Sequence, residues 1–166
     1  MSHAGHGEEK NGRMSLGEAA LKGALAASLG GLAMKLVWEA EQKLLPAEER
    51  LGSPTKGAVE AIAEKRDIQL TDAQASAGAA AFYGGTMAGW GAVFGMVQSR
   101  FHPPDALHGL LLGGILYSLN FPKFGLLPKL GVLPAPSQQS RSQAAVPIGP
   151  HIVFGLTTAA AFRALS

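Results

Sequence analysis

The stretch AQASAGAAAFYGGTMAGWGAVFGMVQS, residues 73–99, contains no Asp, Glu, Lys or Arg in 27 consecutive positions. A helix on the surface of a soluble protein carries charged side chains on an outer face that recurs every 3.6 residues, and this stretch has no such face. A transmembrane helix needs about 20 mainly apolar residues. The stretch therefore predicts a membrane-spanning helix. The alternative is a soluble Ala- and Gly-rich helical bundle, because Ala and Gly gain little from lipid.

Three further charge-free runs occur in the chain. Residues 106–122 give a run of 17 and residues 142–162 a run of 21. The run at 23–34 has only 12 residues, so it reaches spanning length only if Lys22 and Lys35 snorkel to the membrane surface. We therefore predict an all-α integral membrane bundle of four transmembrane helices, at about 16–40, 72–99, 105–120 and 147–165.

Capping patterns mark where two of these helices begin. Ser15 with Glu18, and Thr71 with Gln74, have the spacing of a capping box. We expect residues 1–14 to be a polar flexible tail and residues 15–166 to form a single membrane domain. Ser53-Pro54 predicts a short connecting helix to about Arg66, which lies either on the membrane and its neighbours or in solvent.

Composition excludes several classes of function. Charged residues make up 16% of the chain and the net charge is +2, so no basic footprint for nucleic acid is present. The chain has no Cys, which excludes disulfides and thiolate metal sites. Every acid lies outside the long charge-free runs, and no phosphate-binding glycine loop follows a predicted strand. We predict a protein that is not an enzyme and that has no cofactor or metal.

Small residues recur at four-residue spacing within the predicted helices. Close backbone approach at small residues drives helix association in lipid, where no hydrophobic force acts between helices. The spacing predicts helix packing within the chain or, as the alternative, a face for a partner or a second copy. The predicted packing residues are Gly30, Gly31, Gly85, Gly89, Gly91, Gly95, Gly109 and Gly113.

Three histidines are candidates for chemistry: His102, His108 and His151. Two histidines on facing helices could hold haem. His108 and His151 both lie near helix starts, and alternating helices place these starts on opposite membrane faces. We therefore expect each of them to be an interfacial hydrogen-bonding residue.

The connection before the last helix contains a repeated hexad, PKFGLL at 122–127 and PKLGVL at 128–133. Prolines spaced by six residues argue against an α-helix. One interpretation is a polyproline-type strip on the membrane surface, with Phe124 and three leucines on one apolar face. The other is a pair of turns, in which proline presets φ and glycine relieves the bend.

These residues resemble the YagU-like family of bacterial inner-membrane proteins. The F-P-x-x-G-L-x-P element of that family is similar to Phe121, Pro122, Gly125, Leu126 and Pro128. The stretch that contains Lys35, Trp38, Glu41, Pro46 and Arg50 is similar to the end of the family's first span. The motif Gly149-Pro150-His151 resembles its last helix start. The chain lacks the family histidine before F-P and the acid before G-H.

The resemblance implies a multi-pass protein of the bacterial cytoplasmic membrane and a link to acid tolerance. We expect a structural or accessory membrane protein that associates with itself or with a larger membrane complex. The alternative is a small transporter or channel component linked to pH, built around His151. Nine of the 14 basic residues lie on the side of the 42–70 and 123–146 connections, which favours a cytoplasmic location for these connections.

Overall fold

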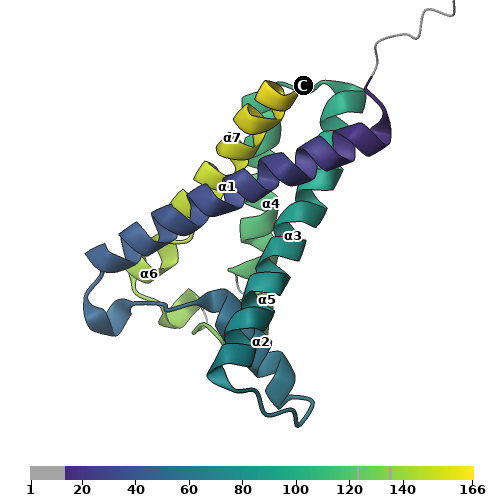
Figure 1. The fold of residues 1–166 in the computed structure, drawn as a ribbon. Coiled ribbons are helices and arrows are strands. Elements are labelled where there is room, and N and C mark those ends of the chain that lie inside the picture. The colour runs from purple at the N-terminus through teal and green to yellow at the C-terminus, as the bar shows by residue number, and fades with distance from the viewer. Residues whose placement is uncertain (1–13, 123, 135) are drawn as a thin grey trace, which may run out of the picture.

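The computed structural model describes residues 14–122, 124–134 and 136–166, and these residues form helices and connections without a strand. The tail predicted at 1–14 lies outside the described residues except for Met14. The elements are α1 (Leu16–Leu44), η1 (Ala47–Glu49), α2 (Pro54–Glu64), α3 (Asp72–Phe101), α4 (Asp105–Asn120), α5 (Leu126–Leu130), η2 (Pro136–Gln138), α6 (Arg141–Ala145) and α7 (Ile148–Leu165). The start of α1 and the end of α7 lie at one end of the molecule, and α2, α5 and α6 lie toward the other (Figure 1).

The boundaries of the long helices follow the capping signals. Thr71 and Gln74 form both halves of the predicted capping box. Ser15 accepts a hydrogen bond from the Glu18 N–H at 3.1 Å. The Glu18 carboxylate pairs with Lys22 at 2.8 Å instead of reaching back to Ser15. α1 continues to Leu44, four residues beyond the predicted end.

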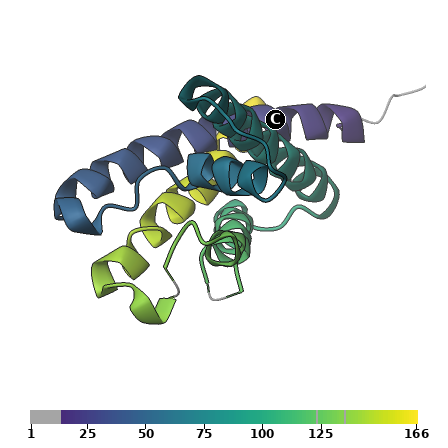
Figure 2. The ribbon, with the colours of Figure 1, turned by 90° about the horizontal axis from the view of Figure 1, so that it is seen from below.

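The four long helices pack in the spatial order α3, α1, α7, α4. α1 contacts α3 and α7, and α4 contacts α7. α1 crosses α3 obliquely, and the two helices separate toward the C-terminal end of α1 (Figures 1 and 2). The contact between α1 and α3 is closest at small residues: a Cβ atom at Gly23 would collide with the backbones of Gly91 and Gly95. The core between the helices also holds large side chains, among them Phe94 of α3 and Phe154 of α7.

Large apolar side chains lie on the outside of this bundle. Along α1, the buried residues are all small except Gln42. The opposite face carries five leucines whose exposed fractions lie between 52% and 69%: Leu21, Leu25, Leu29, Leu32 and Leu36. The outer faces of α4 and α7 likewise carry exposed Leu and Ile, among them Ile115 and Leu156. The distribution on α1 is the reverse of that of a soluble helix, which buries its large apolar side chains.

Two segments are long and apolar enough to cross a membrane: Leu16–Leu44 and Arg141–Leu165. α4 has 16 residues and is too short for this criterion. α3 has 30 residues, but its glycines, its polar side chains and its Tyr and Trp side chains lower its mean hydropathy. The described residues therefore show an all-helical chain with two candidate membrane spans. α3 and α4 are not among these candidates.

The prediction that the hexad repeat excludes an α-helix is wrong. Residues Leu126–Leu130 form the single-turn helix α5, and Pro128 lies in its first turn, where a missing N–H breaks no intrahelical bond. The turn interpretation is confirmed, since the Gly125 N–H donates to Pro122 O at 2.6 Å and the Gly131 N–H donates to Pro128 O at 3.1 Å. Gly131 has a φ of +77°, which suits glycine.

The leucines of the repeat face the protein rather than forming a surface strip, whereas Phe124 is 79% exposed. Leu127 and Leu133 are buried against Ala58 of α2. α2 in turn contacts α3. The connecting helix therefore lies on its neighbours, as the first of the two interpretations expected.

Candidate functional site

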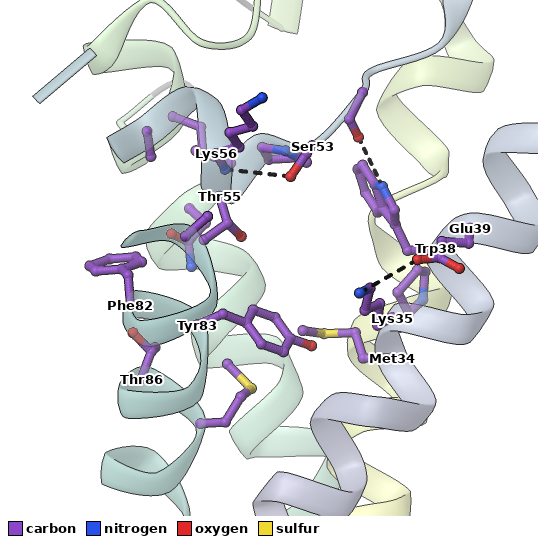
Figure 3. A pocket seen from close by; sticks show the side chains of 18 of the residues that line it. Met34, Lys35, Trp38, Glu39, Ser53, Thr55, Lys56, Phe82, Tyr83 and Thr86 are labelled. Carbon is purple, nitrogen blue, oxygen red and sulfur yellow. Dashed lines mark hydrogen bonds and ion pairs between the residues drawn. The ribbon is translucent and has the colours of Figure 1, made fainter. Parts of the chain in front are cut away.

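A cavity of about 820 Å³ opens where α1 and α3 separate. Its walls come from the C-terminal half of α1 and the N-terminal half of α3, and α2, α5 and the ends of α4 and α7 close its lower end. Figure 3 shows Tyr83 and Phe82 on one wall and Met34 and Trp38 on the other. Its volume lies within the range of small-molecule sites, roughly 300–1,000 Å³.

Side-chain size explains why the cavity forms at this level. Near the start of α1, glycines bring the two backbones into contact at Gly23 and Gly91. About two turns farther along α1, Gly31 faces the larger side chains of Met87 and Tyr83. The Tyr83 hydroxyl donates to Gly31 O at 2.6 Å. These side chains hold the helices apart, and the space below them is left open.

The lower rim is fixed by two hydrogen bonds to the connection after α1. The Trp38 indole N–H donates to Gly52 O at 3.1 Å. The Gln42 Oε1 atom accepts from the Leu51 N–H at 2.6 Å. The Trp38 indole therefore holds this connection against α1.

An aromatic cluster forms the side of the cavity nearest α7. His151 is buried, with its ring packed edge-on against Phe121 and Tyr117, at centroid distances of 5.3 and 5.8 Å. Its Nδ1 atom lies 2.6 Å from Pro147 O. A carbonyl oxygen can only accept, so Nδ1 carries the proton and Nε2 is the acceptor in the neutral ring.

Two buried polar atoms beside the cavity have no hydrogen-bond partner in the described part of the chain: Glu41 Oε2 and Gln42 Nε2. Glu41 lies against Gly149 at the start of α7, where a Cβ atom would collide with the carboxylate. Gln42 lines the cavity and has an exposed fraction of only 9%. An unpaired buried donor is costly and indicates a missing partner.

The charged residues that line the cavity are mainly basic. They are Lys35, Lys43, Arg50 and Lys56, with Glu39 as the acid. Lys35 lies 3.8 Å from Glu39. Lys56 hydrogen-bonds the Asp72 carboxylate, and this bond raises the pKa of Lys56 above its ordinary value. The rim therefore presents positive charge to anything that enters.

Six of the eight predicted packing glycines lie at contacts between helices. Gly91 and Gly95 contact α1, Gly30 contacts Phe154 and Thr158 of α7, and Gly31 contacts α3. Gly109 and Gly113 contact the backbone of α7. Gly85 and Gly89 have no atom of another described residue near a Cβ position. The prediction that they pack within the chain is wrong, and the alternative of a partner face stays open for them.

The residues of the family motif converge on the cavity. Lys35, Trp38, Phe121, Leu126 and His151 line it, although they come from both ends of the chain. Pro122 and Pro128 shape the turns beneath it, and Gly125 lies so close to Asn120 that no side chain would fit. Sequence reasoning missed Tyr83 and Gln42. For Tyr83, the available signal was a polar group inside a charge-free helix, whereas Gln42 lies among charged residues and gave no such signal.

The remaining histidines have structural roles. His108 stacks on Phe94 with a centroid distance of 4.1 Å and lies 2.5 Å from Gln98 Oε1, so it ties α4 to α3. His151 contacts the opposite end of α4 at Tyr117, which separates the two histidines as expected. Exposed His102 ends α3 with a φ of +49°. Among the described residues, no group of three His, Asp or Glu side chains could hold a metal ion.

Comparisons with family models, curated proteins and solved structures found no match. The resemblance to the YagU-like family therefore stays a prediction. The geometry of the cavity carries the functional argument instead.

Proposed function

We propose that this chain is a small integral membrane protein of structural or accessory type, and that all four long helices cross the bilayer of the bacterial cytoplasmic membrane. The observation that carries the proposal is the arrangement of side-chain sizes on α1, where glycines and alanines face the protein and five leucines face outward. Small residues at helix contacts and large apolar residues outside are typical of membrane bundles.

The position of the charges supports four spans. The end of the molecule that holds the start of α1 and the end of α7 carries Glu18, Lys22, Arg100, Asp105 and Arg163, and most of the remaining described charges belong to the other end. The middle of α3 and of α4 has none. Two candidate spans by composition are α1 and the α6–α7 segment. α3 packs against α1, and α4 packs against α7. We therefore place α3 and α4 in the same bilayer as these two candidate spans.

Association with a second copy or a larger complex is the proposed mode of action. Gly85 and Gly89 form an exposed small-residue face on α3, with open space above both. Close approach of another membrane helix at this face would supply packing that the chain itself does not. No catalytic activity is proposed.

Replacing both glycines tests this mode. In Gly85→Ile/Gly89→Ile, we expect the protein to insert into membranes normally and its oligomeric state or its partner capture in detergent to change. Gly114→Ile is the matched control, because Gly114 also has open space at its Cβ position but lies on α4. Unchanged oligomers and unchanged partner capture in the double variant would rule the mode out.

A transporter or channel component linked to pH is the second candidate, and it is favoured by the buried His151 beside the cavity. Its test is flux through the reconstituted protein between about pH 5 and 8, where histidine titrates. Absence of flux over this range would rule out the transporter or channel role, and the accessory role would be the remaining proposal.

A further inference from the structure

The cavity combines an apolar wall with a polar, basic rim. The apolar wall includes Leu32, Phe82, Met87 and Leu116, and it extends into the level of the charge-free segments. Lys35, Lys43, Arg50 and Lys56 lie on the rim with a single acid, Glu39. A ligand that matches both parts has an apolar chain and a negatively charged head.

Gln42 adds a directional requirement. Its Oε1 atom accepts from the Leu51 N–H, so rotation of the amide would bring two donors together. The Nε2 group is therefore fixed as a donor. The Nε2 atom is buried and has no acceptor among the described residues, and it belongs to a side chain that lines the cavity. A ligand oxygen would satisfy it, whereas a purely apolar ligand would leave it unpaired.

The positive charge on the rim is only partly neutralised within the protein. Lys56 is paired with Asp72, and Lys35 with Glu39 at 3.8 Å. Lys43 and Arg50 have no carboxylate within 4.0 Å in the ranges that the structure describes. Lys43, Arg50 and Gln42 all line the cavity, so an anionic head group that enters it would meet these two cations.

We propose that the cavity binds one anionic phospholipid of the surrounding bilayer. The phosphate lies at Gln42 Nε2 and the basic rim, and an acyl chain lies along the apolar wall between α1 and α3. The opening between the diverging helices lets lipid enter from the side. Lateral entry rests on the proposed membrane location, but the chemistry of the site does not.

The proposal is tested with the purified full-length chain in a non-ionic detergent. Phosphatidylglycerol and phosphatidylcholine with identical acyl chains are titrated separately, and bound lipid is counted by native mass spectrometry. We expect one phosphatidylglycerol per chain, bound about tenfold or more tightly than phosphatidylcholine. Both lipids carry a phosphate, but the choline cation of phosphatidylcholine is repelled by the basic residues that line the cavity.

Two variants test the site: one removes the hydrogen-bond donor, and the other fills part of the cavity. Gln42→Glu keeps the acceptor for the Leu51 N–H but replaces the donor with negative charge, so phosphatidylglycerol should bind about tenfold more weakly. Gly84→Leu places a side chain in the cavity, where Gly84 lines the wall and a Cβ atom meets open space. Gly114→Leu is its control on α4 and should bind as the wild type does.

Several outcomes overturn the proposal: equal binding of the two phospholipids, detergent alone in the cavity, or unchanged binding in Gln42→Glu. Tighter binding of oleate than of phosphatidylglycerol would overturn the assignment to a phospholipid. Because the titration is done in detergent, it is independent of how many helices span the bilayer. Failure of lipid binding and failure of the proposed membrane topology are therefore distinguishable.

Discussion

The Tyr83 hydroxyl of α3 donates a hydrogen bond to the Gly31 carbonyl of α1, at 2.6 Å. This bond joins the two helices just where their backbones separate, between the glycine contacts above and the cavity below. Gly31 also lets α3 approach here, since a Cβ atom at this position would lie only 2.9 Å from Met87 Cγ. One residue pair therefore links the packing of the bundle to the shape of the cavity.

Tyr83→Phe should reduce the stability of the protein in detergent by about 0.6 kcal/mol, the average for hydrogen bonds between membrane helices. Thermal unfolding with and without phosphatidylglycerol measures it. Tyr117→Phe is the control, because the Tyr117 hydroxyl makes no hydrogen bond within the described residues. Equal losses in both variants would show that the bond to Gly31 contributes nothing specific.

Gly155→Ala should destabilise the contact between α4 and α7. A Cβ atom at Gly155 would collide with the Gly109 carbonyl, so the helices must separate. Overpacking of this kind typically lowers the free energy of unfolding by about 1–3 kcal/mol.

The matched control is Gly114→Ala, at a helical glycine with open space. It should be neutral or stabilising by up to about 1 kcal/mol, the helix-propensity difference between Gly and Ala. Denaturation of both variants in the same detergent gives the comparison. If Gly155→Ala is as stable as Gly114→Ala, the close contact of the two helices is not a source of stability.

The number of spans is tested by two single-cysteine variants, since the chain has no native Cys. With four spans, Arg66→Cys and His102→Cys lie on opposite membrane faces. With only α1 and α7 in the bilayer, they lie on the same face. Labelling of intact cells and of inverted vesicles with a membrane-impermeant maleimide measures this. The positive-inside rule predicts Arg66 in the cytoplasm, so only His102→Cys should react in intact cells.

Much of the fold follows from local signals in the sequence. The Thr71 capping box begins α3, and the stop near Phe121 ends α4 as expected. α5 was not predicted because proline was taken to break helices at every position, whereas Pro128 lies in a first turn. Whether a proline lies in the first turn can be judged only when the start of the helix is known. The N-cap of α5 is Gly125, which has no side chain that could accept a capping hydrogen bond and so indicate a helix start.

Prediction of the contacts was less complete, for a geometric reason. Gly85-x-x-x-Gly89 and Gly91-x-x-x-Gly95 have the same spacing, but a six-residue step rotates the second pair by about 120° around the helix. Only the second pair faces α1. Spacing identifies a small-residue face without saying what covers it. Gly23 and Gly155 are not among the predicted packing residues, although each has an alanine at the same four-residue spacing, Ala27 and Ala159.

The cavity could not be predicted, because its lining comes from distant parts of the chain. Trp38, Tyr83 and His151 are brought together by the crossing of α1 over α3 and by the contact of α1 with α7. Gln42 follows the charge-free part of α1 and reads in the sequence as part of a polar connection. Its unpaired amide becomes visible only when the burial around it is known.

The central claim is that the exposed apolar faces of the four long helices lie in lipid. Single nitroxide side chains report it most directly when placed at one exposed apolar position on each helix: Leu25, Val93, Ile115 and Leu156. In reconstituted vesicles, collision rates with oxygen and with a water-soluble nickel complex are compared, with exposed Ser137 as the aqueous control. We predict high oxygen and low nickel accessibility at all four positions and the reverse at Ser137. Nickel accessibility at the four positions equal to that at Ser137 would contradict the account.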